Sequence, residues 1–370
     1  MARDGTGSKL RGVNLGGWLV LEKWMAPSLF AGLAARDETS WCAELGRDAA
    51  PRLRAHWDTF IARDDFAWLA AAGVSAVRIP VGHWIFGPPV PYHPRYGASP
   101  HPFVEGGIEV LDRALDWARE HGLSVVLDLH AAAGCQNGFD NGGLQDVCEW
   151  HTRDEYVSHT VEVLARLADR YRASDALAAI EVLNEPRWDV PTELLLRFYR
   201  RAHAAIRAHC PAGRVAVVFH DGFRSHREWL ALFAAPEIDG AVLDVHRYQC
   251  FTPEDLALDL AGHVQRAALT WRDEADEIQR ELDAPAIAGE WSLGLDPNGF
   301  VRSADRPAGH PLAGMDAFQE DVAYRAYAAA QLAAFERYRG WFFWSYRTET
   351  APAWCFRACV ERGWLPARFQ

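Results

Sequence analysis

Eight short apolar segments, distributed along the whole chain, constrain its fold more than any other feature of the sequence. Most are rich in Val, Ile, Ala or Phe, and each spans only a few residues. Continuous apolar runs of this length are typical of strands that are buried on both faces, as in a parallel sheet. The expected strands are Gly12–Leu15, Ala76–Ile79, Ser124–Leu129, Ala179–Leu183, Val215–Phe219, Ala241–Val245, Ala286–Gly289 and Trp341–Trp344.

The segments between these strands carry apolar residues at every third or fourth position, which predicts helices. Eight strands that alternate with helices favour a single (β/α)8 barrel, and a chain of 370 residues fits one such domain over residues 1–370 with long loops. An open, doubly wound sheet is the alternative, but no Gly-rich phosphate loop follows the first strand. The expected helices are Ile61–Ala72, Ile108–His121, Asp154–Arg172, Thr192–Ala208, Leu256–Leu282 and Phe318–Arg337.

Charge and cysteine content restrict the partners and the location of the protein. The formal net charge of −12 argues against a nucleic-acid ligand, because phosphate binding needs a cationic face. No apolar run is long enough to cross a bilayer, so no integral membrane association is expected. No signal segment is visible in Met1–Ser8, and the seven cysteines are an odd number, which favours the cytoplasm, or secretion if a signal has been removed. The oligomeric state is left open.

Polar side chains collect at the carboxyl-terminal ends of the predicted strands. In a barrel these ends surround one mouth, and active sites lie there. A single polar residue at a strand end means little, but seven strand ends carry residue types suited to catalysis or binding. These residues are Asn14, Arg78, His130, Asn184, Glu185, His246, Tyr248, Glu290 and Trp344.

Two carboxylates in this set, Glu185 and Glu290, follow the fourth and the seventh strand. Glycoside cleavage needs two carboxyl groups beside the scissile bond, about 5 Å apart for retention and roughly 6.5–9.5 Å apart for inversion. Arg78 would lower the pKa of one carboxylate, and Tyr248 would donate a hydrogen bond to a nucleophile. An isolated glutamate is more often part of a buried ion pair with arginine. The pairing of two glutamates at the mouth favours catalysis instead.

The residues around these two glutamates resemble those of glycoside hydrolase family 5 of clan A. The short motifs that carry the resemblance are Asn184-Glu185-Pro186 and Gly289-Glu290-Trp291-Ser292. Longer segments resemble the exo-β-1,3-glucanase branch of this family and extend the similarity over nearly the whole chain. They are Arg11–Glu22, Val77–Gly82, Asp128–His130, Gln136–Asn141, His246–Phe251 and Phe343–Glu349.

The resemblance implies a role for each matching residue. Glu185 would be the acid/base and Glu290 the nucleophile, and the peptide bond after Trp344 is often cis in the family. Phe139 and Phe251 would clamp the second sugar at the entrance. Arg78, Asn184, His246 and Tyr248 would hold the nucleophile and the substrate, and Glu22, His130, Asn141 and Trp344 would bind the terminal glucose. Trp18, Trp24 and Trp84 are expected in the core.

The predicted function is that of a retaining β-glycosidase, an exo-β-1,3-glucanase or β-glucosidase that releases terminal β-linked glucose from a small carbohydrate or glucoside. No metal and no organic cofactor is implied. A β-glucosidase for steryl or ceramide glycolipids is an alternative, because intracellular relatives in this branch act on glucosylated lipids. Endo-β-glucanase or mannanase activity is a second alternative. A non-catalytic carbohydrate-binding barrel is a third, although such a protein would usually lack one of the two carboxylates.

Overall fold

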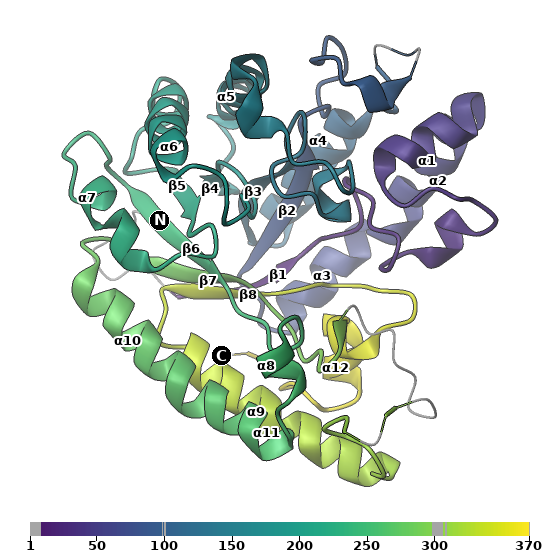
Figure 1. The fold of residues 1–370 in the computed structure, drawn as a ribbon, viewed down its shortest axis with the longest axis vertical. Helices are drawn as coiled ribbons and strands as arrows, with labels where there is room; N and C mark the ends of the chain where they lie inside the picture. The colour runs from purple at the N-terminus through teal and green to yellow at the C-terminus, as the bar shows by residue number, and fades with distance from the viewer. Residues whose placement is uncertain (1–8, 98, 100, 298–305, 308, 370) are drawn as a thin grey trace.

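Eight parallel strands form a closed barrel in the computed structural model, which describes residues 9–97, 99, 101–297, 306–307 and 309–369 (Figure 1). The strands follow one another in chain order, and β8 closes the barrel by pairing with β1. The expected barrel and all eight expected strands are therefore confirmed. The strands are β1 (Leu10–Asn14), β2 (Ala76–Gly82), β3 (Ser124–Ala131), β4 (Leu177–Glu181), β5 (Ala216–His220), β6 (Ala241–His246), β7 (Ala286–Trp291) and β8 (Gly340–Phe343).

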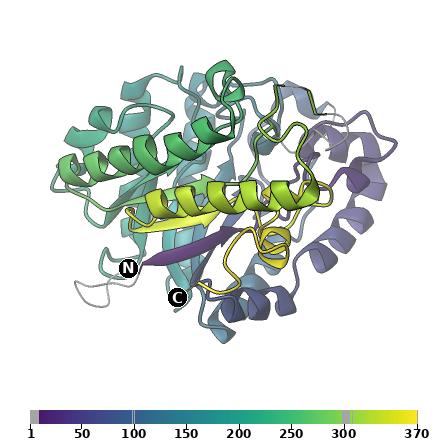
Figure 2. The same ribbon diagram turned by 90° about the horizontal axis from the view of Figure 1, so that it is seen from below.

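Helices surround the barrel, and two turned views show them outside the sheet (Figures 1 and 2). Five of the six expected helices form within a few residues of the predicted bounds, because each buries one apolar face and exposes the other. They are α3 (Arg63–Ala71), α4 (Gly107–Glu120), α5 (Asp154–Tyr171), α6 (Thr192–Arg207) and α11 (Ala317–Phe335).

The sixth expected helix, Leu256–Leu282, is wrong as one continuous element. Asp259 accepts a hydrogen bond from the backbone N–H of Gly262 and so starts a new helix inside the segment. Further along, the helical turns widen to a π-helix before the regular α-helix resumes. The observed elements are α8 (Pro253–Leu256), α9 (Leu260–Gln265), the π-helix Arg266–Trp271 and α10 (Arg272–Glu281).

Two helices that the sequence did not predict, α1 (Glu38–Leu45) and α2 (Ala49–Phe60), brace the loop after β1. Glu38 accepts a hydrogen bond from the backbone N–H of Leu21 at 2.8 Å, and Trp18 donates from Nε1 to the carbonyl of Trp57 at 2.9 Å. The loop that carries Glu22 is therefore held by two helices packed beside it. Two further unpredicted helices are α7 (Leu230–Phe233) and α12 (Phe356–Glu361).

The inside of the barrel is built from layers of side chains, because every second residue of a strand points inward. The lower part of the interior is apolar and consists of Leu10, Ala76, Val126, Ala179, Ala216, Val218, Val242, Ile287 and Phe342. The next inward positions are polar and fully buried, and they place a charged layer directly beneath the mouth. These residues are Asn14, Arg78, Asp128, Glu181 and Asp244.

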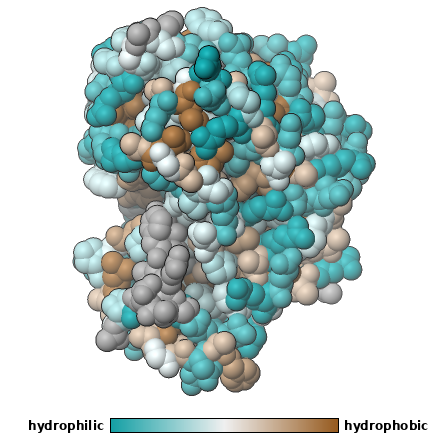
Figure 3. Space-filling model, turned by 90° about the vertical axis from the view of Figure 1, so that its right-hand side faces the viewer, coloured by the Kyte–Doolittle hydropathy of each residue, from teal (hydrophilic) through white to brown (hydrophobic). Residues whose placement is uncertain are grey.

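The outer surface is mostly hydrophilic on the face shown in Figure 3, where apolar residues form small, scattered groups. Over the described part of the chain, none of the helices combines the length and the apolar character needed to cross a membrane. Because active sites of such barrels lie at the carboxyl-terminal ends of the strands, the strand ends and the loops at the mouth are the elements that position the site.

Candidate active site

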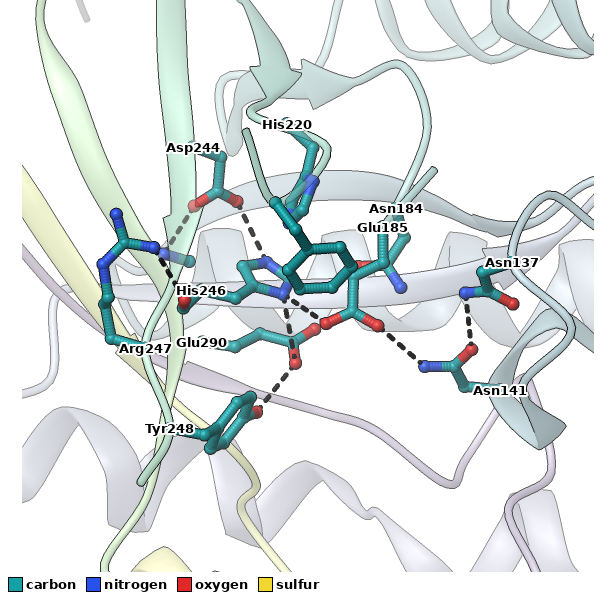
Figure 4. Close-up of polar contacts among 12 residues, drawn as sticks. Asn137, Asn141, Asn184, Glu185, His220, Asp244, His246, Arg247, Tyr248 and Glu290 are labelled. Carbon is teal, nitrogen blue, oxygen red and sulfur yellow. Dashed lines mark hydrogen bonds and ion pairs between the residues drawn. The ribbon is translucent and has the colours of Figure 1, made fainter. Parts of the chain in front are cut away.

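The two predicted catalytic carboxylates meet at the mouth of the barrel, and His246 lies between them (Figure 4). Nδ1 of His246 is 2.8 Å from Oε1 of Glu185 and 3.5 Å from Oε2 of Glu290. Since both oxygens lie that close to one nitrogen, they are at most roughly 6 Å apart, which fits the spacing of retaining rather than inverting glycosidases. Both side chains are buried, with 7% and 4% of their surface exposed.

A tight backbone turn directs the Glu185 side chain into the site. Glu185 has φ +44°, in the left-handed region that few residues other than glycine adopt and that is typical of functional sites. Gln136 holds the turn by donating from Nε2 to the carbonyl of Asn184 at 2.9 Å. Asn141 donates to Oε2 of Glu185 at 3.2 Å and accepts a hydrogen bond from Asn137 at 3.0 Å. The position of Glu185 is thus fixed by the backbone turn and by the hydrogen bond to Oε2.

Arg78 and Tyr248 fix the second carboxylate. Nη1 of Arg78 donates to Oε1 of Glu290 at 3.0 Å, and the hydroxyl of Tyr248 donates to Oε2 at 2.8 Å. The guanidinium is fully buried and uses its remaining N–H groups on the charged layer below. Its other partners are Oε2 of Glu181 at 2.7 Å, Oδ1 of Asn14 at 3.0 Å, Oδ1 of Asn184 at 2.8 Å and Oδ2 of Asp128 at 3.1 Å.

The two carboxylates have opposite pKa shifts. Burial raises the pKa of Glu290, and the charge of Glu185 adds to this rise against the opposing charges of His246 and Arg78. Burial also acts upward on the pKa of Glu185, but the hydrogen bond and the charge of His246 bring it below its usual value. Burial disfavours the cationic form of His246, yet Glu290 and Asp244 hold its pKa well above the usual value. These shifts favour a proton on His246 that is shared with Glu185 through their hydrogen bond.

Several buried polar atoms near the two carboxylates have no partner among the described residues. They include Oε1 of Glu22, Nε2 of His130 and Nδ2 of Asn184. Because buried polar atoms are normally hydrogen-bonded, these atoms are suited to bind the hydroxyl groups of a sugar. Trp24, expected only in the core, is buried but also donates from Nε1 to Oε2 of Glu22 at 2.9 Å. Its indole N–H therefore belongs to the site, a contact that a core assignment misses.

Trp344 directly follows β8 and packs beside His130. Its indole is parallel to the imidazole of His130, with ring centroids 5.3 Å apart. The peptide bond between Trp344 and Ser345 is cis, as the resemblance implied. Asp128 accepts a hydrogen bond from Nδ1 of His130 at 2.6 Å, so the imidazole is held from below.

The two phenylalanines expected at the entrance differ in their surroundings. Phe251 is 51% exposed and lies edge-on to Tyr248, with ring centroids 5.5 Å apart. Phe139 is half-buried on the loop after β3, where its backbone N–H donates to Oδ1 of Asn137. No ring contact joins the two phenylalanines among the described residues. Their role as a clamp stays a prediction.

Four residues of the site were not assigned from the sequence, namely Asp128, Glu181, His220 and Asp244. The three acidic residues stand alone inside apolar strand segments, at the inward positions just below the mouth. An isolated charge within a buried strand was the signal that would have found them. His220 ends β5, the one predicted strand for which no mouth residue was expected.

Comparisons with known proteins identify the family of the chain. Residues 44–346 match the family model of cellulases, glycosyl hydrolase family 5. The chain is 36% identical to the glucan 1,3-beta-glucosidase of Blumeria graminis, an alignment that covers 99% of this chain and 88% of that protein. It is 38% identical to the probable glucan 1,3-beta-glucosidase A of Aspergillus fumigatus, over 97% of this chain and 87% of that one.

The fold is also similar to solved structures. The crystal structure of rutinosidase from Aspergillus niger superposes with a TM-score of 0.79 at 18% sequence identity, covering 98% of this chain and 99% of that one. Such low identity supports the barrel alone, whereas the family match and the curated relatives span most of the sequence. The predicted family is therefore confirmed: the chain belongs to glycoside hydrolase family 5.

Proposed function

We propose that this enzyme releases terminal β-linked glucose from β-1,3-glucans or short β-glucosides, with retention of configuration. The proposal rests on the close approach of Glu185 and Glu290 to Nδ1 of His246. Their nearest carboxylate oxygens lie 2.8 and 3.5 Å from this nitrogen. This spacing leaves no room for a water molecule between a carboxylate and the sugar, as inversion would require. The relatives named glucan 1,3-beta-glucosidase support the choice of substrate.

In the first step, a carboxylate oxygen of Glu290 attacks the anomeric carbon while the bond to the leaving oxygen breaks. Glu185 gives its proton to that oxygen, so the sugar is left as an ester of Glu290 and the aglycone departs as an alcohol. In the second step, Glu185 takes a proton from water, the water oxygen attacks the same carbon, and Glu290 leaves as a carboxylate. Two displacements return the product to the β-configuration.

The shared proton explains how Glu185 serves as an acid although its pKa is lowered. The proton on Nδ1 of His246 is one hydrogen bond of 2.8 Å away from Oε1 of Glu185. Binding of a neutral sugar excludes water from both groups, which favours the neutral imidazole and carboxylic acid over the ion pair. Transfer along this hydrogen bond would then supply the acid form at the leaving oxygen.

The loop after β1 supports release of a terminal sugar rather than internal cleavage. Glu22 is 4% exposed, and α1 and α2 brace its loop. A carboxylate held so deeply suits a pocket that is closed behind the last sugar, whereas endo-glucanases and mannanases need an open cleft. A glycolipid glucosidase would use the same pocket and differ at the exposed entrance around Phe251.

The first test combines a substrate panel with a matched pair of variants. We expect the protein to hydrolyse p-nitrophenyl β-glucoside and to prefer laminaribiose over cellobiose, gentiobiose, mannobiose and steryl glucoside. Glu290→Gln should lower kcat by about 10⁴-fold or more, because nothing else can form the ester. Glu185→Gln should lose activity on disaccharides but keep much of it on 2,4-dinitrophenyl β-glucoside, whose leaving group departs without a proton.

Circular dichroism of both variants serves as the control for folding. Proton NMR of the first product should show β-glucose. Wild-type turnover by Glu290→Gln, or α-glucose as the first product, would contradict the assignment. Preference for steryl glucoside or mannobiose would leave the mechanism intact and change the substrate.

A further inference from the structure

His220 lies inside the active site, and the mechanism above gives it no role. It ends β5, which lies between β4 and β6, and its side chain is fully buried. Glu185 follows β4, and His246 ends β6. The imidazole of His220 stands edge-on to that of His246, with ring centroids 4.3 Å apart and an interplanar angle of 81° (Figure 4). A histidine in this position is either packing for His246 or a further hydrogen-bonding group.

The hydrogen bonds of His220 define which nitrogen carries its proton. Nδ1 accepts a hydrogen bond from the backbone N–H of Gly222 at 2.9 Å. Burial, together with the charges of His246 and Arg78, keeps the pKa of His220 well below its usual value, so the ring is neutral. A neutral ring that accepts at Nδ1 must carry its hydrogen on Nε2. Nε2 has no hydrogen-bond partner among the described residues, so a buried donor is left over.

The position of the His220 ring points to Glu185. One ring nitrogen of His220, one ring nitrogen of His246 and one carboxylate oxygen of Glu185 lie within 4.8 Å of one another. Such a trio also has the ligand types of a metal site. However, a cation on Nε2 would have to displace its hydrogen while Nδ1 stays occupied by Gly222, and this would require an imidazolate. The chemistry therefore favours a hydrogen-bond donor over a metal ligand.

We propose that His220 is a positioning residue for Glu185, donating from Nε2 to the carboxylate that forms when Glu185 gives its proton to the leaving oxygen. Catalytic hydrogen bonds are often long in the unliganded enzyme and shorten during the reaction, so a His220 ring nitrogen within 4.8 Å of a Glu185 oxygen is compatible with this contact. A third donor, beside His246 and Asn141, makes Glu185 a stronger acid. This inference rests on the proposed function, in which Glu185 is the acid/base.

Other charged groups act on the same two side chains and stay unchanged in the experiment. Those that act on Glu185 come from the loop after β1 and from β3, β6 and β7, and those that act on His220 come from β2, β5, β6 and the loop after β5. They are Glu22, His130, His246, Glu290 and Tyr248 for Glu185, and Arg78, His246, Arg247, Arg224 and Asp221 for His220. Any change in a His220 variant is therefore measured against one electrostatic background.

Two amide variants distinguish the role of Nδ1 of His220, which is near the backbone, from that of Nε2, which is farther away. In His220→Asn the amide reaches only the place of Nδ1 and still accepts from Gly222, whereas in His220→Gln an amide N–H reaches the place of Nε2. We expect His220→Asn to lower kcat/KM on the disaccharide that the wild type hydrolyses best by roughly 10- to 100-fold. On 2,4-dinitrophenyl β-glucoside its kcat/KM should change less than about twofold. His220→Gln should recover most of the loss.

The pH profile gives a second readout that packing alone would not move. Without the donor the carboxylate of Glu185 is less stable, so the coupled pair of Glu185 and His246 holds its proton more tightly, and the basic limb of kcat/KM in His220→Asn should move to higher pH. His203→Asn is the matched control, since His203 is also a buried imidazole, bonded through Nε2 to the carbonyl of Asp239 at 2.9 Å outside the site. It should leave both substrates and the pH profile unchanged.

The outcomes are distinguishable. Equal losses on both substrates with an unmoved basic limb would show that His220 only packs against His246, and a His220→Gln variant as poor as His220→Asn would exclude the distal donor. His220→Asn with wild-type rates would also overturn the inference. Failure of the wild type on every β-glucoside would instead remove the proposed function.

Discussion

At the level of single residues, the imidazole of His246 determines where the protons of the active site lie. It contacts Glu185 and Glu290 through one nitrogen and approaches Oδ2 of Asp244 through the other at 3.5 Å. A cationic imidazole between carboxylates keeps one proton available at the leaving oxygen without protonating the nucleophile. In the proposed mechanism, one shared side chain thus separates the roles of acid and nucleophile.

This arrangement predicts the pH dependence of the reaction. Glu290 must be ionised to attack, and its pKa is raised, so kcat/KM should fall on acidification through an apparent pKa above the ordinary glutamate value of about 4.3. Tyr248→Phe removes a donor to the ionised form, which should raise this pKa further, move the acidic limb to higher pH and lower kcat/KM by about 10-fold.

Tyr92→Phe is the control for that measurement, because the Tyr92 residue is exposed and its hydroxyl bonds, within the described part of the chain, only to the carbonyl of Gly97. Its pH profile should match the wild type. An acidic limb that stays in place in Tyr248→Phe would show that the hydroxyl does not stabilise the ionised nucleophile.

The residues of the site were predictable to different degrees. Glu185, Glu290, Arg78 and Trp344 were expected because each lies at the end of a predicted strand at the mouth, and the resemblance added Glu22 and Asn141. Asp128, Glu181 and Asp244 share the buried layer of Arg78 and were not assigned, since a strand pattern read residue by residue does not show which charges share a layer. Their contacts with Arg78 and His246 depend on the closed barrel, which brings together strands far apart in the chain.

At the level of elements, the site depends on how closely the loop after β1 approaches the end of β8. A Cβ at Gly16 would lie 2.7 Å from both Cη2 and Cζ2 of Trp344, so only glycine lets the indole lie where it does. Ser345 confirms the close approach, because its hydroxyl accepts from the backbone N–H of Gly16 at 3.0 Å. The position of Trp344 against His130 is therefore set by a residue on another element.

Gly16→Ala should displace this indole. We expect kcat/KM on the preferred disaccharide to fall by about 10-fold, mainly through KM, and the free energy of unfolding to drop by about 1–3 kcal/mol. Gly213→Ala is the control, since an added Cβ there meets nothing within 4 Å. An unchanged KM together with a lower stability would mean that Trp344 does not contact the substrate.

Elements differed in how well the sequence revealed them. The strands were found because runs buried on both faces are continuously apolar, and α4, α5 and α6 were found because one face of each is apolar. In contrast, α1 buries Glu38 and Thr39 along with Trp41 and Cys42, so its buried residues do not form an apolar stripe. The break before α9 depends on the side chain of Asp259 rather than on hydrophobic period.

At the level of the whole molecule, the barrel is closed by its first and last strands. Leu10 pairs with Gly340 and Val13 with Phe343, and the chain then returns to α3, where the backbone N–H of Phe369 donates to the carbonyl of Ala72 at 2.8 Å. One continuous core lies between the barrel and its helices. Loss of any one strand would open the sheet and expose the charged layer.

We therefore expect the protein to unfold as one unit. Calorimetry should show a single transition, and the loss of activity in urea should coincide with the changes in tryptophan fluorescence and far-UV circular dichroism. The Glu290→Gln variant, followed by the two spectroscopic probes, controls for local melting of the active site. Two resolved transitions, or activity lost well before the spectroscopic change, would contradict a single domain over residues 1–370.

Glu22 follows β1, whereas Trp344 follows β8. The proposed sugar site therefore joins a residue that is synthesised early with one that is synthesised late. A nascent chain that still holds β8 inside the ribosome has both catalytic glutamates outside but lacks Trp344 at this site. Hydrolysis should consequently begin only after the final strand emerges. Enzyme activity would then measure how many chains have completed folding, without any label or antibody.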